Sequence, residues 1–100
     1  MTENKTGQDS NIIFVGDKPL MNYVTGIIMQ MTTKNSNEVI VKARGKYISR
    51  AVDIAEVTKR KFLETQPVEV SDIKIGSEGF ENKEGRKINV SFVEITLTKK

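Results

Sequence analysis

The chain lacks cysteine and histidine altogether. Without cysteine it has no disulfide framework and no thiol chemistry, and without histidine it lacks the commonest general base and a usual zinc ligand. We therefore expect a protein that is not an enzyme and that holds no metal and no cofactor. No apolar run approaches the ~20 residues that a membrane-spanning helix needs, and the polar N-terminus shows no signal sequence. These features predict a soluble, intracellular protein.

What is present is a short, mildly basic chain of 100 residues, with 16 Lys and Arg, 13 Asp and Glu, and a net charge of +3. This length corresponds to one domain, and a domain this small often relies on a partner to cover its core. Residues 1–10 are polar and show no periodicity, so we predict a disordered tail before a domain at 11–100. A mild excess of positive charge is compatible with nucleic acid as a ligand but does not establish it.

The first strand and helix are predicted between residues 11 and 31. An apolar run at 11–15 ends at Gly16 and indicates a buried strand. Pro19 suits the first position of a helix, and Asp17 can cap it. The helix has one apolar stripe that we expect to face a sheet, with methionines filling gaps in the core: Leu20, Val24, Ile27, Ile28 and Met31, beside Met21 and Met29.

The most informative stretch is the second strand, turn and helix, at residues 39–52. A β-branched strand leads through a turn at Gly45 into a helix with Ile48, Ala51, Val52 and Ala55 on one face. Between Glu38 and Asp53 there is no acid but four bases, namely Lys42, Arg44, Lys46 and Arg50. A helix N-terminus attracts anions, and glycine lets the backbone approach a phosphate. Basic runs of this length also occur as ordinary solvated surface, so the phosphate site and the solvated turn both stay open here.

The last third of the chain predicts a hairpin. Val68 and Val70 alternate, and then the parity shifts to Ile73 and Ile75, which indicates a bulge or strong twist near Ser71. After a polar loop at 81–87, the final strand repeats such a switch of faces. A protruding hairpin with apolar residues is unstable alone, so we infer a homodimer.

Together these elements predict an α+β fold of order β-α-β-α-β-β. Both helices are expected on one face of a four-stranded mixed sheet, with an extended hairpin formed by the last two strands.

Two stretches of the chain resemble the Alba family of archaeal chromatin proteins. They are Gly16 to Val24 and Lys42 to Asp53, supported by Phe62-Leu63, Gly76-Ser77 and the β-branched C-terminal strand. The resemblance covers roughly Asn11 to Lys99. It implies a fold like that of the C-terminal domain of translation initiation factor three, a dimer with arm-like hairpins, and binding to double-stranded DNA and to RNA.

The same resemblance assigns roles to individual residues. It implies nucleic-acid contacts from the first turn, the second turn and the hairpin tip, and a contact between dimers along DNA through Phe62. The implied binding residues are Lys18, Lys42, Arg44, Lys46, Lys83, Arg86 and Lys87. The chain departs from the family at Asp17, where members often have an acetylated lysine. A carboxylate there repels phosphate, so we expect weaker binding than in a two-lysine relative.

Three functions follow as alternatives. The main hypothesis is a dimer of limited sequence specificity, associated with the chromosome in the cytoplasm, that clamps duplex phosphates and reaches the minor groove with its hairpins. The second is an RNA-binding subunit of a ribonucleoprotein. The third is a small enzyme using Asp53 and Glu56, which lie one helical turn apart beside Lys59 and Arg60 and are more typical of a solvated helix face. We expect no membrane partner and no small-molecule substrate.

Overall fold

The computed structural model describes residues 11–62 and 66–100. The predicted tail at 1–10 and Leu63 lie outside the described residues. The elements are β1 (Ile12–Phe14), α2 (Leu20–Thr32), β2 (Glu38–Arg44), the short 3-10 helix η1 (Gly45–Tyr47), α3 (Ile48–Phe62), β3 (Val68–Glu81) and β4 (Lys87–Lys99). The predicted order β-α-β-α-β-β is confirmed.

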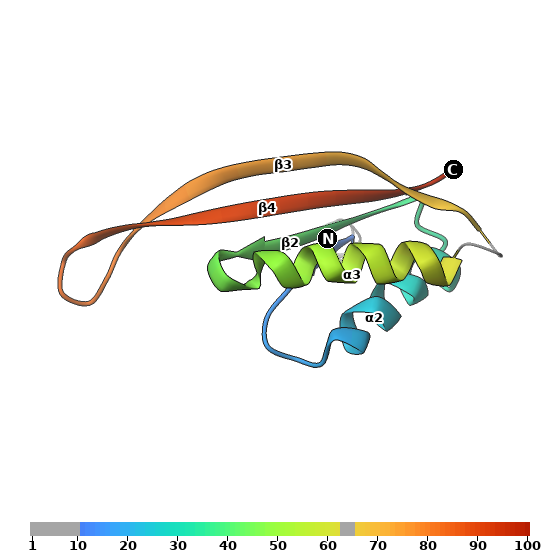
Figure 1. Cartoon of the computed structure of the whole chain (residues 1–100), viewed down its shortest axis with the longest axis horizontal. Coiled ribbons are helices and arrows are strands. Elements are labelled where there is room, and N and C mark those ends of the chain that lie inside the picture. Colours follow the sequence, from blue (N-terminus) through green and yellow to red (C-terminus); the bar gives the residue numbers. More distant parts are fainter. Residues whose placement is uncertain (1–10, 63–65) are drawn as a thin grey trace, which may run out of the picture.

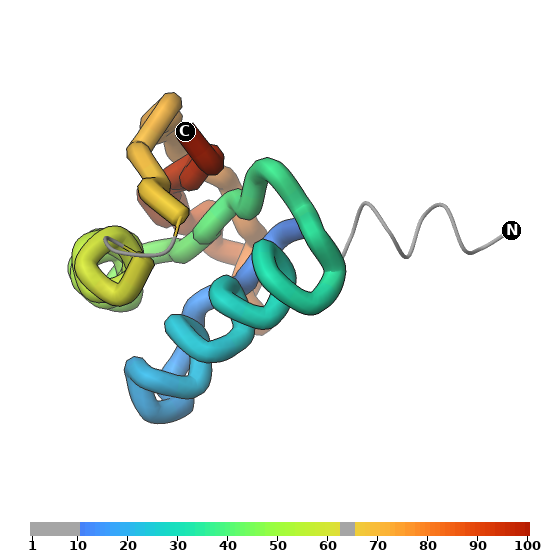
Figure 2. Tube along the Cα trace, turned by 90° about the vertical axis from the view of Figure 1, so that its right-hand side faces the viewer, coloured from blue at the N-terminus to red at the C-terminus, as the bar shows by residue number. Residues whose placement is uncertain are grey.

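The four strands form one mixed sheet in the order β1-β2-β4-β3. β1 is parallel to β2, whereas β4 is antiparallel to both of its neighbours. Both helices cover the same face of this sheet, as the ribbon and the end-on view show (Figures 1 and 2). We call the opposite face, which carries no helix, the open face.

The core lies between the sheet and the two helices. Val39, Val41 and Ala43 alternate with polar neighbours along β2 and are buried against the helices. The predicted helix stripes are confirmed in part, because Val24, Ile27 and Met31 are buried, as are several α3 residues (Ala51, Ile54, Ala55, Thr58 and Phe62). Three predicted core residues are instead exposed, namely Met21, Met29 and Val52. Met21 and Val52 lie beside the buried stripes of their helices, whereas Met29, two residues from both Ile27 and Met31, faces the opposite side of α2.

The start of α2 differs from the prediction. Pro19 is the N-cap residue rather than the first helical residue, and no side chain caps the helix, so the predicted cap at Asp17 is wrong. The hydroxyl oxygen of Tyr23 instead accepts hydrogen bonds from the backbone N–H groups of Gly16, at 2.8 Å, and Lys18, at 3.2 Å. The first turn of α2 therefore fixes the loop before it.

The predicted hairpin is present, and its strands β3 and β4 are longer than β1 and β2. The register between β3 and β4 shifts between Val70 and Asp72, which confirms the irregularity expected near Ser71. Pairing of β2 with β4 ends at Arg44 and Phe92, whereas β3 and β4 continue to pair with each other as far as Glu81 and Lys87. We call residues 77–91 the arm, because this part of the hairpin pairs with no other strand. The arm projects beyond the body in Figure 1.

Candidate nucleic-acid interface

Two basic turns lie at the same end of the sheet, where β1 and β2 terminate. β1 and β2 are parallel, so their carboxyl ends meet there, and the loop after β1 contains Lys18 while η1 after β2 contains Lys46. Gly45 begins η1 with φ +55°, a conformation that glycine adopts without strain. Ligands of sheets with parallel strands bind in this position, beyond the carboxyl ends of the strands. We call the group Lys18, Arg44, Lys46 and Arg50 the basic edge.

Hydrogen bonds hold the two turns together. The Arg50 guanidinium, from the first turns of α3, donates to the backbone carbonyl of Lys18. Tyr23 fixes the same loop from the other side by accepting the N–H groups of Gly16 and Lys18. The loop that contains Lys18 is therefore tied to the beginning of α3, which directly follows the turn that contains Lys46.

The basic side chains differ in whether a carboxylate forms an ion pair with them. Within residues 11–62 and 66–100, no carboxylate lies within 4.0 Å of the ammonium group of Lys18 or Lys46. The Lys46 Nζ atom lies 5.4 Å from the centroid of the Tyr47 ring, a cation–π distance. Both lysines are exposed, and their charges are available to an anion from solution.

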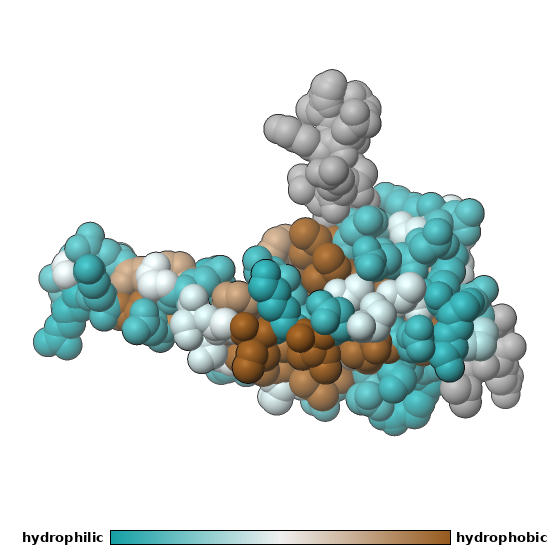
Figure 3. Space-filling view, turned by 90° about the horizontal axis from the view of Figure 1, so that it is seen from above, coloured by the Kyte–Doolittle hydropathy of each residue, from teal (hydrophilic) through white to brown (hydrophobic). Residues whose placement is uncertain are grey.

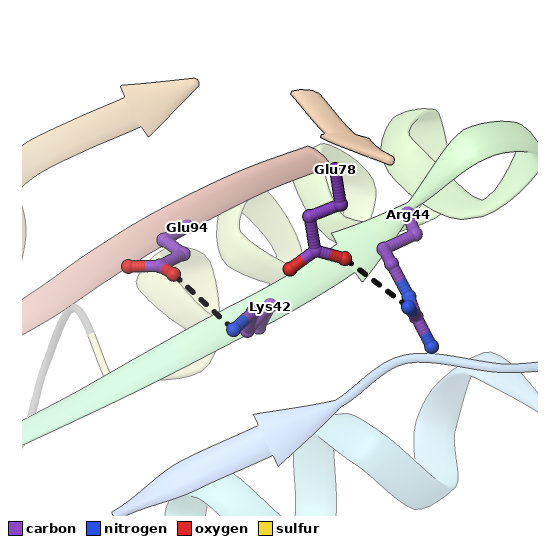
Figure 4. Close-up of polar contacts among 4 residues, drawn as sticks. All are labelled: Lys42, Arg44, Glu78 and Glu94. Carbon is purple, nitrogen blue, oxygen red and sulfur yellow. Dashed lines mark hydrogen bonds and ion pairs between the residues drawn. The ribbon is translucent and has the colours of Figure 1, made fainter. Parts of the chain in front are cut away.

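Lys42 and Arg44 already have acidic partners. Glu94 on β4 approaches Lys42, with 3.4 Å between Nζ and Oε2, and Glu78 approaches Arg44, with 3.1 Å between Nη1 and Oε1 (Figure 4). The Lys42 side chain is 28% exposed and that of Arg44 is 53% exposed. Arg44 is thus the more accessible base, and its partner Glu78 belongs to the arm.

Three further predicted residues lie at the tip of the arm. Asn82 builds this tip, because its side-chain oxygen accepts the backbone N–H groups of Glu84 and Arg86, each at 2.9 Å. Gly85 completes the turn with φ +82°. The turn leaves three basic side chains exposed, those of Lys83, Arg86 and Lys87. The structure therefore separates the predicted residues into a group on the body and a group at the arm tip.

Comparison with known proteins identifies the family. A family model described as Alba matches residues 11–77. The chain is 51% identical over 89 residues to the DNA/RNA-binding protein Alba of Nanoarchaeum equitans, covering 88% of this chain and 97% of that protein. It is 46% identical over 89 residues to the protein of the same name from Methanococcus maripaludis, covering 89% and 98%. The solved structure of Alba from Thermoplasma volcanium superposes with a TM-score of 0.76 at 46% identity, covering 87% of this chain and 98% of that one.

The chain belongs to the Alba family. The resemblance seen in the sequence and the predicted fold are thereby confirmed.

Phe62, assigned by the resemblance to contacts between dimers, is 3% exposed and belongs to the core. Its ring is covered within its own subunit. A contact between dimers through Phe62 stays a prediction, and it requires this part of α3 to expose the ring.

The described residues also show how acidic side chains and helices are arranged away from the basic edge. Among the described residues, no group of three or more acidic side chains is placed to hold a metal ion. No helix in the described part is long and apolar enough to cross a membrane. Glu56 pairs with Lys59 at 3.5 Å on the exposed surface of α3, which agrees with a solvated helix face.

Several residues of the interface were not predicted from the sequence. Glu78 and Glu94 lie 34 and 52 residues from their partners, so only the strand register brings them together. Phe14 is 66% exposed, although it lies in an apolar run that predicted a buried strand. Arg50 was visible as one of four bases, but its role in joining the turns required the fold. The Asn82 to Gly85 spacing was the one local signal, because asparagine and glycine are typical turn residues.

Proposed function

We propose that this Alba-family chain is a homodimeric DNA- and RNA-binding protein with little sequence specificity. The basic edges of both subunits hold the phosphates of a duplex, and the arms extend along its minor groove. The observation that carries this proposal is the coupling of two basic turns at one edge of the sheet by the hydrogen bond from Arg50 to Lys18. The names of the relatives, DNA/RNA-binding protein Alba, support it.

Binding to phosphates follows from the free charges of the basic edge. No carboxylate in the described part of the chain lies within 4.0 Å of the ammonium group of Lys18 or Lys46, so a phosphate that binds there breaks no ion pair. Phosphate contacts fix the position of a protein on a duplex but carry no direct sequence information. A site of this kind predicts binding that depends strongly on salt and little on sequence.

The arm adds a second contact region. Its tip exposes Arg86 between Lys83 and Lys87, on a turn that Asn82 fixes. An arginine in the minor groove senses the width of the groove more than the identity of the bases. Such arms increase the length of duplex contacted without adding much sequence preference.

A second subunit follows from the apolar surface at the root of the arm. Ile73 and Ile75 lie beside Ile95 and Val93 in the strand register and so point to the helix-covered face, but they are 60% and 76% exposed. Figure 3 shows apolar surface gathered where the arm leaves the body. Single exposed apolar residues are common, but a contiguous group of β-branched side chains is typical of an interface. We assign this surface to the interface of the homodimer. Binding of the dimer to duplex DNA would associate the protein with the chromosome.

A salt titration tests the phosphate contacts. If the dimer makes about 6 phosphate contacts, the logarithm of the binding constant for a random 30-base-pair duplex falls against log salt with a slope of about −5. Lys46→Ala removes two contacts from the dimer, so the slope becomes less steep by about 2. Lys34→Ala is the matched control, because Lys34 is an exposed lysine beyond the opposite end of α2 and its loss changes the net charge equally.

The outcomes separate the functions. Equal effects of Lys46→Ala and Lys34→Ala would show that only net charge matters and would remove the basic edge from the mechanism. A slope near zero would contradict phosphate binding altogether. Strong binding to a structured RNA with negligible binding to the duplex would favour the role as a ribonucleoprotein subunit.

A further inference from the structure

A small cleft opens next to the basic edge, between β1 and β2 of the body and the beginning of the arm. It has a volume of about 400 Å³ and lies at the carboxyl ends of β1 and β2. This volume lies within the range of roughly 300–1,000 Å³ that is typical of small-molecule sites. Its walls include two aromatic rings, two cations and one carboxylate, from Phe14, Tyr47, Lys42, Arg44 and Glu78. The combination is unusual for a plain phosphate contact, which needs no aromatic ring.

Phe14 is the residue that needs an explanation. It is 66% exposed, lies outside the core cluster and belongs to β1, an edge strand of the sheet. The surface assigned to the second subunit includes Ile73 and Ile75 on β3, which is the opposite edge strand. In the proposed homodimer the Phe14 ring therefore stays in contact with solvent.

The cations are arranged next to this ring. Lys42 lies opposite Phe14 in the parallel register of β1 and β2, and its Nζ atom is 5.9 Å from the centroid of the ring. Arg44 lies two residues further along β2, so both side chains point to the open face. Arg44 uses Nη1 for Glu78, which leaves most of its five N–H donors for another acceptor. An aromatic surface with two adjacent cations fits a planar group that is attached to a phosphate.

We propose that this cleft binds an unpaired nucleobase, which stacks on Phe14 while Lys42 and Arg44 contact the phosphate of the same nucleotide. Proteins that bind single strands combine these two elements, an aromatic stacking surface and a positively charged path for the backbone. A base inside a duplex is stacked on its neighbours, so the cleft accepts bases from single strands, loops or ends. The inference rests on the proposed function, because Arg44 serves both the duplex and the single strand, but Phe14 serves only the single strand.

The test compares single-stranded and duplex ligands with variants of Phe14. We would use a ten-nucleotide single-stranded RNA and the matching DNA, each with one 2-aminopurine, whose fluorescence reports stacking. Phe14→Leu removes the ring but keeps an apolar side chain at a position already two-thirds exposed, so the fold is preserved. Phe14→Tyr retains the ring and should restore binding. Met29→Leu, on the exposed side of α2, is the control for an apolar substitution away from the cleft.

Loss of the ring should weaken single-strand binding by about fivefold to a hundredfold, since stacking of one base is worth ~1–3 kcal/mol. The change in 2-aminopurine fluorescence at saturation should also be lost, whereas binding to the 30-base-pair duplex should change less than twofold. Equal single-strand affinity of wild type and Phe14→Leu would overturn the inference. A parallel loss on the duplex would also overturn it, because Phe14 would then act through the fold or the phosphate contacts.

Competition with adenosine monophosphate distinguishes a free nucleotide from a nucleotide within a strand as the ligand of the cleft. Displacement of the strand by millimolar mononucleotide, absent in Phe14→Leu, would show that the cleft accepts a free nucleotide. Failure to displace it, with single-strand binding that still depends on Phe14, would identify the strand as the ligand. The proposed duplex function is tested separately from the single-strand cleft, because it fails if the wild type binds no duplex at low salt.

Discussion

Within the basic edge, Arg44 is the base that forms an ion pair with a carboxylate in the described residues. The partner of Arg44 is Glu78, an exposed ion pair in which the two side chains are 53% and 34% exposed. Exposed pairs of this kind contribute only ~0–1 kcal/mol, so a phosphate can compete for the guanidinium. In the proposed complex, Glu78 therefore competes weakly with phosphate for Arg44, and the same ion pair links the arm to β2.

Glu78→Gln should strengthen duplex binding by about twofold to fivefold, because Arg44 loses its competitor and the duplex loses a repelling charge. The measurement is the dissociation constant for a random duplex at two salt concentrations. Glu56→Gln is the control, since it breaks the exposed pair with Lys59 on α3 and changes the net charge equally. Weaker binding of Glu78→Gln would show instead that the ion pair positions Arg44 for its ligand.

Asp17→Lys should also tighten duplex binding, by a larger factor of about fivefold to twentyfold, because two charges change sign next to Lys18 in each dimer. Asp17 is exposed and does not cap α2, so the substitution should not lower the melting temperature by more than about 2 °C. Glu38→Lys is the control, because Glu38 is exposed at the beginning of β2, away from the carboxyl ends of the strands. An equal gain from Glu38→Lys would mean that net charge, and not position, sets the affinity.

The helices and strands could be predicted from the sequence more completely than the contacts between them. The periodicity of the sequence was sufficient for two helices, the hairpin and the irregularity near Ser71, because each signal is local. It could not tell which of the apolar side chains each helix buries, so it predicted Met29 and Val52 to lie in the core, and both are exposed. It also could not pair Arg44 with Glu78, since their meeting depends on β4 lying between β2 and β3. The basic turns were predictable as charged segments, but their coupling through Arg50 was not.

The hairpin depends on a close contact between a glycine and an aromatic ring. Gly76 lies opposite Phe92 in the register, and a Cβ atom added at Gly76 would come within 2.7 Å of the ring. Gly76→Ala should lower the free energy of unfolding by about 1 kcal/mol, at the low end of overpacking costs, because the half-buried Phe92 ring can move partly away. The measurement is denaturant unfolding followed by circular dichroism.

Gly79→Ala is the matched control in the same strand. A Cβ atom there would approach Asn89 at 3.5 Å, an ordinary contact, and the backbone of Gly79 does not have a positive φ. Its stability should therefore stay the same or rise slightly through the lower entropy of the unfolded chain. If both variants lost equal stability, strand position rather than the Phe92 ring would explain the effect.

In the proposed dimer, the two edge strands of the sheet have different roles. The exposed Phe14 lies on β1, near the carboxyl ends of β1 and β2 where the basic edge is found, whereas the exposed Ile73 and Ile75 lie on β3. A dimer formed through the β3 edges leaves both clefts open and brings two basic edges into one assembly. Linking two sites in this way raises the apparent affinity well above that of one subunit, because the second contact becomes intramolecular.

Ile75→Asp tests this arrangement, because it places a charge at the most exposed apolar residue of the arm root, 76% exposed. At low micromolar concentration the wild type should sediment with twice the chain mass of 11.2 kDa, and Ile75→Asp with the mass of one chain. Duplex binding should fall by about tenfold to a hundredfold with the loss of the second subunit. Met29→Asp, a similar change at an exposed residue of α2, should leave both the mass and the binding unchanged.

A dimer that persists in Ile75→Asp would show that the interface lies elsewhere on the molecule. A monomeric wild type would mean that the apolar root of the arm has some other partner, and that one chain with one basic edge accounts for all of the binding.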